Sequence, residues 1–477
     1  MRQAPGTDVF MTTRLAPGVS PVRVGTGNVA AHPDVRPAVR WLVGRAWPIC
    51  VTLLLVAIGM AYSLCWGSLV HHSSYWVTPG DLWGTYFAAH FVQWGYLGGV
   101  YTAGGGLVSF PGITVVLAPC AWFTGLLHLS SSYPKMLPHP TAWLVLGPYE
   151  ILVSSTALFA LDRLVRDLGV VSWRRGALCF LQGVLLFGVS VIWGHPEDAL
   201  AVALVTWALC AALRDRFAAA GWLAGIAVAV QPLVVLALPV LVLRFPPRRW
   251  GALALRIALP ALALLATPLI SNFTPTWRAI TVQPNFPGID HPTPWLVFAR
   301  RLPPIAAHHV TVIKRVGGRF VSTTTRAVGQ SVVAAGPLRS AAVVMAGVIA
   351  LMAWWRKRAW FTSPLNAIWL VTLAFALRIF FEPVMDPYYL WPPLAIAVVL
   401  AATKRSPSRL AVVGVLSIAL SAFAYWHVSP WIYWTPLVVG LGVILVATLP
   451  TRPRASSDLG GTVAENVHEP LEGAVAR

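Results

Sequence analysis

The stretch PICVTLLLVAIGMAYSLCWGSLV, residues 48–70, contains no acidic or basic side chain. About 20 such residues form a helix that crosses the hydrocarbon core of a bilayer. The chain of 477 residues is 57% hydrophobic and 11% charged, a composition typical of a multi-pass membrane protein. We therefore predict an all-α integral membrane protein with about 11–13 transmembrane helices. Further candidate spans occupy roughly residues 107–128, 141–161, 176–194, 197–213, 251–271, 337–355, 363–381, 387–403, 409–427 and 431–449.

The positive charge of the chain lies mostly in short loops between these segments. The formal net charge is +19, and basic loops beside spans are typical of the cytoplasmic side of a membrane. The charge pattern therefore indicates topology, and no nucleic acid partner is expected. Loops predicted to be cytoplasmic are 162–175, 213–217, 244–250, 356–358 and 404–409. Loops predicted to face outward are 71–106, 194–197, 272–336, 382–386 and 427–430.

This pattern divides the chain into three regions. Residues 1–46 are predicted to be a basic, disordered cytoplasmic tail, because they carry several arginines and no long apolar core. Residues 47–450 form the transmembrane domain. Residues 451–477 are polar and are predicted to be a second disordered cytoplasmic tail.

Two segments do not fit a topology in which each apolar segment crosses the membrane once. Two apparent spans separate the outer loop 71–106 from the basic loop 162–175, although these loops belong on opposite sides. Either residues 107–140 cross incompletely, or the basic loop is external. Segment 218–243 begins and ends beside basic loops and is interrupted by Gln231 and the proline after it. Because proline breaks a helix, we predict a pair of short helices that enters and returns to the same side.

The cysteines give no sign of a cross-link or a metal centre. All five lie singly in or beside apolar runs, without a CxxC motif or a Cys/His cluster. Neither a disulfide framework nor a zinc site is indicated. We predict no cofactor, and no metal is indicated, although Asp81 with Glu197 or Asp198 could hold a divalent ion if the fold brings them together.

Asp81 is the only acidic residue between Asp34 and Glu150, and it follows the first candidate span. A lone carboxylate at a membrane boundary suggests a catalytic base in a polar cavity. An aspartate after Pro-Gly also suits a helix N-cap, which stabilises a helix by about 1 kcal/mol. The two roles are compatible. The residues after it have the spacing of a short helix lying along the membrane surface.

A second outward position is the turn Trp193-Gly194-His195-Pro196-Glu197-Asp198, which carries three titratable groups. Proline suits the first turn of the following helix, and the two carboxylates suit its positive N-terminal end. The functional alternative is that His195 or Asp198 points into a cavity and contacts a sugar or a phosphate.

Two more outward positions carry ionisable groups. Arg378 and Glu382 are four residues apart and can pair on one helix face. Tyr388 and Tyr389 follow, and they suit either the membrane interface or a sugar-binding surface. His291 follows an aspartate in the long outer segment. That segment also carries basic residues that can hold either a phosphate group or anionic lipid headgroups.

Several short motifs resemble those of C-type (GT-C) membrane glycosyltransferases that use polyprenyl-phosphate sugars, especially the actinobacterial mannosyltransferases of the phosphatidylinositol-mannoside pathway. The order of these elements covers roughly residues 45–400. Gly112 stands where the family has a second proline, and Gln231 stands where it has a lysine. The motifs are Gly80-Asp81-Leu82-Trp83-Gly84-Thr85-Tyr86, Gly98-Gly99-Val100-Tyr101, Ser109-Phe110-Pro111, Gly194-His195-Pro196-Glu197-Asp198 and Gly221 to Gln231-Pro232.

This resemblance implies a GT-C-like fold and a multi-pass enzyme of the plasma membrane with its active site on the outer side. Such an enzyme transfers a sugar, mannose or arabinofuranose, from a polyprenyl-phosphate donor to a lipid or glycan acceptor. Asp81 takes the place of the family's catalytic carboxylate and acts as general base, with inversion at the sugar carbon. Predicted substrate contacts are His195, Glu197, Asp198, Gln231, His291, Arg378, Tyr388 and Tyr389.

Two other functions remain open. A transporter or flippase of a lipid or polar solute predicts charges within spans and symmetric halves. A non-catalytic membrane scaffold predicts that replacing Asp81 has no effect. No internal repeat is evident in the sequence.

Overall fold

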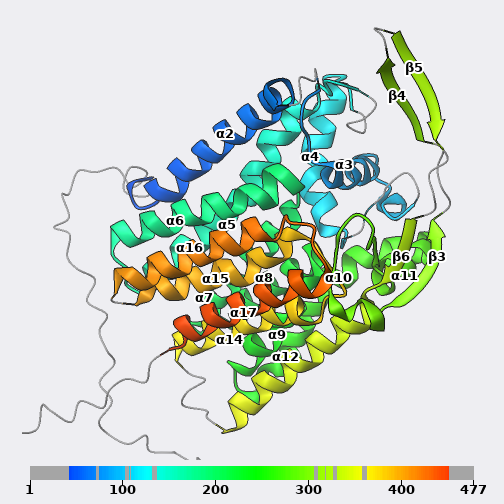
Figure 1. Ribbon diagram of the computed structural model, residues 1–477. Coiled ribbons are helices and arrows are strands. Elements are labelled where there is room, and N and C mark those ends of the chain that lie inside the picture. Colours follow the sequence, from blue (N-terminus) through cyan, green and yellow to red (C-terminus); the bar gives the residue numbers. More distant parts are fainter. Residues whose placement is uncertain are drawn as a thin grey trace, which may run out of the picture. The chain divides into compact units, whose positions relative to one another are not determined.

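The computed structural model describes residues 42–70, 75–102, 107, 109–131, 137–305, 310–316, 319–325, 330–356, 363–404 and 406–450 (Figure 1). The predicted tail 451–477 and nearly all of the tail 1–46 lie outside them. The described chain is mostly helical. Its α-helices are α2 (Ala46–Val70), α3 (Gly80–Gln93), α4 (Gly112–Leu126), α5 (Trp143–Asp167), α6 (Ser172–Phe187), α7 (Pro196–Ala212), α8 (Phe217–Val230), α9 (Leu238–Leu243), α10 (Trp250–Ser271), α11 (Phe273–Thr281), α12 (Gly336–Arg356), α14 (Pro364–Phe381), α15 (Trp391–Thr403), α16 (Pro407–Phe423) and α17 (Pro430–Thr448).

Among the described residues, seven helices are long and apolar enough to cross a membrane. Shorter apolar helices accompany them, including α4, α8 and α16. Helices α7 and α15 are buried along almost their whole length, whereas less than a third of α2 and of α12 is buried. The outer helices therefore present apolar side chains to their surroundings, as expected of a membrane protein. The candidate spans are Ala46–Leu69, Trp143–Asp167, Ser172–Trp193, Pro247–Ser271, Gly336–Arg356, Pro364–Phe381 and Pro430–Thr448.

Loops that the charge pattern assigned to one side do lie together at one end of the helices. The basic loop between α5 and α6 contacts the start of α2, and the loop after α7 contacts the end of α5. The contacts are Trp47 Nε1–H to Ser172 Oγ at 3.2 Å, Lys404 Nζ to Leu449 O at 2.8 Å, and the ion pair Arg214–Asp167. The loops at Ser172, Arg214 and Lys404 therefore lie at one end of the helices, as the charge pattern predicts.

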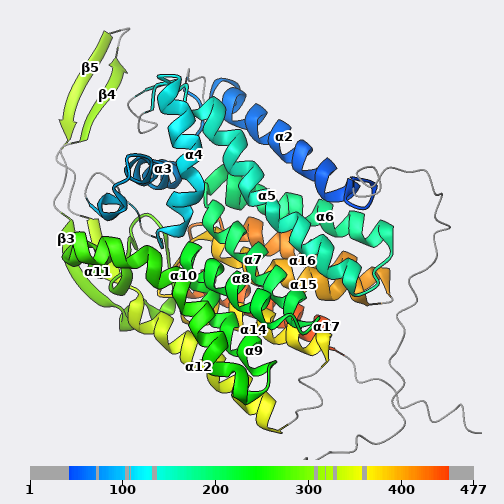
Figure 2. The ribbon, with the colours of Figure 1, turned by 180° about the vertical axis from the view of Figure 1, so that it is seen from behind.

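The opposite end gathers α3, α11 and the short strands, on the right in Figure 1 and on the left in the view from behind (Figure 2). Segments predicted to face outward meet there. Contacts at this end are Asp81 Oδ2 to His195 Nε2 at 3.3 Å, Thr293 Oγ1 to Glu382 O at 2.6 Å, and His427 Nε2 to Ile289 O at 3.3 Å. The predicted site residues lie at this end of the helices or are buried next to it.

The conflict around residues 107–140 has a structural answer. Helix α4 begins inside the protein, where Ser109 Oγ donates to the carbonyl of Val230 over 3.1 Å. After α4 the chain comes back beside the segment that precedes α3, because Trp76 N donates to Pro138 O over 2.9 Å. The described residues between 107 and 140 therefore run from the interior of the protein back to the level of Trp76, which favours the first of the two alternatives.

Segment 217–245 forms the predicted pair of short helices. Helix α8 ends at Val230, the backbone of Gln231 is extended (φ −148°, ψ 117°), and a 3₁₀ turn (Pro232–Ala237) leads into α9. The rings of Phe217 and Phe245 meet edge to face with centroids 5.5 Å apart. Because the two ends of the segment touch, it enters and returns on the same side, as predicted.

The outer segment 272–336 contains strands that the sequence analysis did not predict. Strands β1 (Pro284–Asn285) and β3 (Arg300–Ile305) pair antiparallel with β6 (Gln330–Ala334). A separate hairpin joins β4 (Val310–Val316) and β5 (Arg319–Thr325). Strand β2 (His291–Pro292) pairs with β7 (Val384–Met385), with His291 opposite Met385. This last pair ties the outer segment to the loop after α14.

Candidate active site

Asp81 lies in the first turn of α3, with its side chain 57% exposed. The N-cap position belongs to Pro79, and no side-chain capping bond forms there. Buried Trp83 anchors the helix by donating from Nε1 to Thr78 Oγ1 over 3.0 Å. Asp81 is therefore not the N-cap, and its carboxylate remains accessible at the surface of a rigidly held helix.

Gly194 brings the second predicted site against α3. It follows a π-helical turn (Gly188–Trp193) and has a positive φ of 70°, which L side chains rarely adopt. A β-carbon at this glycine would lie 2.7 Å from Pro79 Cγ and 2.7 Å from Leu82 Cβ. Only glycine allows the turn to approach α3 this closely.

His195 follows that glycine and connects Asp81 with a buried carboxylate. Its Nε2 lies 3.3 Å from Asp81 Oδ2, and its Nδ1 lies 2.7 Å from Glu197 Oε1. The imidazole stacks on Tyr388 with ring centroids 3.9 Å apart. Burial alone would lower the pKa of His195, but the charge of Glu197 and the hydrogen bond to Asp81 raise this pKa well above its usual value. The site therefore favours a positive charge between the two carboxylates.

Asp198 connects this turn to the break between α8 and α9. Gln231 Nε2 donates to Asp198 Oδ1 over 3.0 Å. In the described part of the chain, neither Asp198 Oδ2 nor Glu197 Oε2 has a hydrogen-bond partner. The ligand atoms of His195, Glu197 and Asp198 all lie within 4.8 Å of one another, close enough to hold a metal ion.

A pair of carboxyl groups faces the same region. The register of β2 and β7 sets Asp290 beside Asp386, and their side chains share a hydrogen bond. Burial and the neighbouring charge raise the pKa of Asp290 to about 8. Asp290 therefore favours its protonated form beside Asp386.

His291 lies behind this pair. Its ring is buried, stacked on Tyr433 at 4.6 Å and tilted against His427 at 4.0 Å between centroids. Of the two neighbours, Asp290 faces the carboxyl cluster and His291 packs among aromatic rings.

Arg378 belongs to a buried ion-pair network. Its Nε lies 3.2 Å from Glu382 Oε2, so the predicted pairing of these two residues is present. Arg339 from α12 also binds Glu382, with Nε 2.9 Å from Oε1. The guanidinium carbon of Arg378 lies 3.4 Å from the ring centroid of Tyr389. Two arginines share one carboxylate here, which leaves an excess of positive charge near the site.

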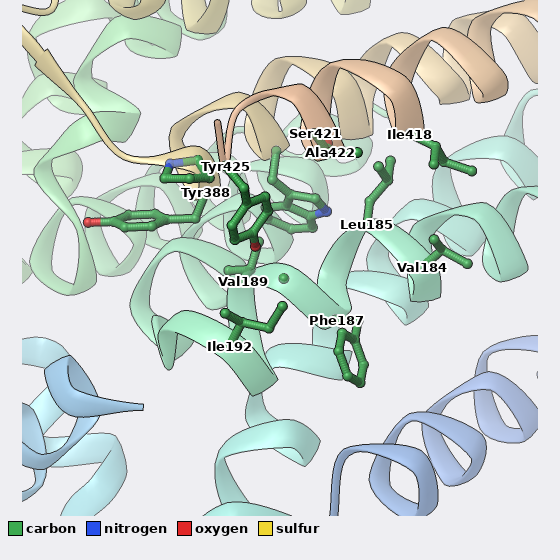
Figure 3. Close-up of a pocket in the computed structure, with 13 residues that line it drawn as sticks. Val184, Leu185, Phe187, Val189, Ile192, Tyr388, Ile418, Ser421, Ala422 and Tyr425 are labelled. Atoms are coloured by element: carbon green, nitrogen blue, oxygen red, sulfur yellow. The ribbon is translucent and has the colours of Figure 1, made fainter. Parts of the chain in front are cut away.

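An apolar pocket of about 170 Å³ borders the polar cluster (Figure 3). Its walls come from α6, the π-helical turn, α15 and α16, and the close-up shows apolar side chains with Tyr388 and Tyr425 at one edge. Tyr388 belongs to both the apolar pocket and the polar cluster, since it lines the pocket and stacks on His195. Ile192 and Val184 in the pocket wall are also exposed on the outside of the helices.

Two charged residues near the site were missed by sequence reasoning. Glu150 is fully buried in α5, accepts a hydrogen bond from Ser154 at 3.0 Å, and interacts electrostatically with Glu197 and His195. Its position as the only acid in the candidate span 141–161 is a signal that could have identified it. Arg339 carried no such signal, because it lies near the end of its span.

The structure brings together Asp81, His195, Glu197, Asp198 and Gln231 from three separate parts of the chain. Tyr388 joins them by stacking, and Arg378 interacts electrostatically with Asp198. No protein-family model and no curated protein matches this sequence.

Proposed function

We propose that the protein is a GT-C-like glycosyltransferase of the plasma membrane that uses a polyprenyl-phosphate sugar on the outer face. The observation that carries the proposal is the position of Asp81. This accessible carboxylate contacts the buried pair His195–Glu197, and Tyr388 connects that pair to an apolar pocket among the helices. A polar site next to an apolar pocket suits a substrate that has a sugar head group and a lipid tail.

In this proposal Asp81 acts as general base. It removes the proton from the acceptor hydroxyl while the acceptor oxygen forms a bond to the anomeric carbon of the sugar. The bond from that carbon to the phosphate oxygen breaks, and polyprenyl phosphate leaves with the bonding electron pair. A single displacement inverts the configuration of the sugar. Because phosphate is a good leaving group, the reaction needs no strong general acid.

The surrounding residues supply binding and orientation. The hydrogen bond from His195 orients the Asp81 carboxylate, which favours a productive geometry. Tyr388 and Tyr389 offer flat faces and hydroxyls of the kind that contact sugars. Arg378 offers positive charge for the donor phosphate, and Gln231 offers an amide for a hydroxyl group. His291 supports this surface from behind through its ring contacts.

The direct test compares the wild type with Asp81→Asn and Asp215→Asn in matched membranes. Asp215 is an exposed acid in the loop after α7, at the opposite end of the molecule, and its backbone has a positive φ of 56°, which asparagine tolerates. Each membrane receives labelled polyprenyl-phosphate mannose or arabinofuranose. We expect transfer by the wild type and by Asp215→Asn, and a loss of at least about 100-fold in Asp81→Asn.

Two results would contradict the proposal. Equal transfer by Asp81→Asn would remove Asp81 from the mechanism. No transfer by any intact, folded variant would reject the transferase, and movement of the lipid across the membrane without transfer would favour the transporter instead.

A further inference from the structure

Glu197 and Asp198 each keep one carboxylate oxygen buried and without a partner among the described residues. Both residues are only 2% exposed, and the free atoms are Glu197 Oε2 and Asp198 Oδ2. A buried carboxylate oxygen without a donor carries a substantial desolvation cost. The positive charges of His195 and Arg378 lie nearby, but these two oxygens still require a direct donor or cation.

The N-terminal end of α7 does not remove this requirement. Carboxylates in a first helical turn gain from the helix dipole, but no side chain makes a capping hydrogen bond at this end. His195 satisfies one oxygen of Glu197, and Gln231 satisfies one oxygen of Asp198. One ligand atom from each of His195, Glu197 and Asp198 lies within 4.8 Å of the other two, so the three side chains converge on one place.

We propose that His195, Glu197 and Asp198 bind a divalent cation. Two ligands on opposite sides of such an ion, each at about 2.1 Å, lie about 4.2 Å apart. A spread of 4.8 Å therefore needs only small side-chain movements to close on the ion. In the bound state His195 Nδ1 and one oxygen from each carboxylate face the cation.

The contact between His195 and Asp81 supports this assignment independently. A metal-bound histidine almost always donates its other ring N–H to a carboxylate or a carbonyl. His195 Nε2 lies 3.3 Å from Asp81 Oδ2, which is this arrangement. Tyr388 on the face of the ring and Gly194 before it hold the imidazole in place.

The donor set selects the class of cation. One imidazole nitrogen and two carboxylate oxygens suit Mn²⁺ or Zn²⁺ better than Ca²⁺, which prefers six to eight oxygens. Binding of the ion does not depend on the reaction. Its role does rest on the proposed function, in which the cation stands beside Asp81 and offers positive charge to the donor phosphate.

Metal binding is measured on the full-length chain purified in detergent, stripped with EDTA, and then equilibrated with Mn²⁺, Zn²⁺ or Ca²⁺. Elemental analysis and thermal unfolding report bound metal without any substrate. We expect the wild type to retain about one Mn²⁺ or Zn²⁺ per chain and to unfold at a higher temperature with it. The near-isosteric variants Glu197→Gln and Asp198→Asn should lose both effects.

Two further variants make the test specific. Asp81→Asn should weaken metal binding about 10- to 100-fold, as expected for a group that orients a ligand. Asp290→Asn removes a nearby carboxylate outside the trio and should bind metal like the wild type. Absence of metal in the wild type, or normal binding by folded Glu197→Gln, would overturn the proposal. Metal binding by a wild type that transfers no sugar would reject only the proposed function.

Discussion

His195 Nε2 lies 3.3 Å from Asp81 Oδ2 although 114 positions separate the two residues in the chain. The contact joins the accessible end of a carboxylate to a buried imidazole whose other nitrogen contacts Glu197. An exposed aspartate on its own samples many orientations, so this contact gives Asp81 a fixed direction.

Removal of the imidazole should therefore slow turnover more than it weakens binding. In His195→Ala, Asp81 keeps its carboxylate but loses its orientation, and we expect kcat to fall about 10- to 100-fold with a smaller change in KM. Steady-state transfer with a labelled donor measures both constants. His195→Gln retains a side-chain amide donor and should recover part of kcat. A KM effect alone, with normal kcat, would show that His195 binds substrate and does not orient Asp81.

Gly194→Ala should damage the site through the contact with α3. The positive φ costs an alanine roughly 1 kcal/mol, and its β-carbon would also meet Pro79 and Leu82 at 2.7 Å. The matched control is Gly169→Ala, since Gly169 has a φ of 74° and nothing within 4 Å of its β-carbon position. Thermal unfolding and transfer are measured for both. We expect similar backbone strain in both variants, but loss of transfer only in Gly194→Ala. Equal transfer in the two would show that the close approach is not needed.

Asp290→Asn should change how stability depends on pH. Burial and the charge of Asp386 raise the pKa of Asp290 to about 8, whereas an unfolded aspartate titrates near 3.9. Between these values the folded state keeps a proton that the unfolded state has lost. Stability therefore falls as pH rises from about 4 to about 8.

The asparagine variant lacks this titration, so its unfolding temperature should decrease less between pH 5 and pH 9. Asp215→Asn, which removes an exposed carboxylate at the other end, should keep the slope of the wild type. Parallel curves for the wild type and Asp290→Asn would mean that Asp290 does not hold the proton.

The sequence predicted the parts of the fold that follow from apolar length and charge position. The basic loops share one end because charge next to a span is costly to translocate. The break at Gln231 was predictable because proline cannot continue a helix. Asp81 and His195 were both expected at outer ends, although nothing in the sequence placed them in contact.

Other features depend on contacts between distant segments. The β2–β7 pair is only two residues long on each side, too short for an alternating pattern, so the meeting of Asp290 and Asp386 could not be predicted. The need for a glycine at position 112 is also visible only in three dimensions. A β-carbon there would lie 2.4 Å from the carbonyl oxygen of Ala229.

Filling the apolar pocket should weaken the binding of the lipid part of the donor. Ala422→Phe places a ring in the space bordered by Tyr388 and Tyr425. Each buried methylene contributes about 0.8 kcal/mol, so the loss of two such groups should raise KM about 15-fold. Val415→Phe adds the same ring on the same helix, at an exposed residue that does not line the pocket, and serves as control.

The comparison is made with a long-chain polyprenyl-phosphate donor and with a short-chain analogue. Ala422→Phe should raise KM for the long chain and leave the short chain nearly unchanged, because the short chain does not reach the pocket. An equal rise for both donors would mean that the ring disturbs Tyr388 and the polar site behind it. An unchanged KM for the long chain would place the hydrocarbon elsewhere on the protein, since a filled pocket cannot also hold a lipid tail.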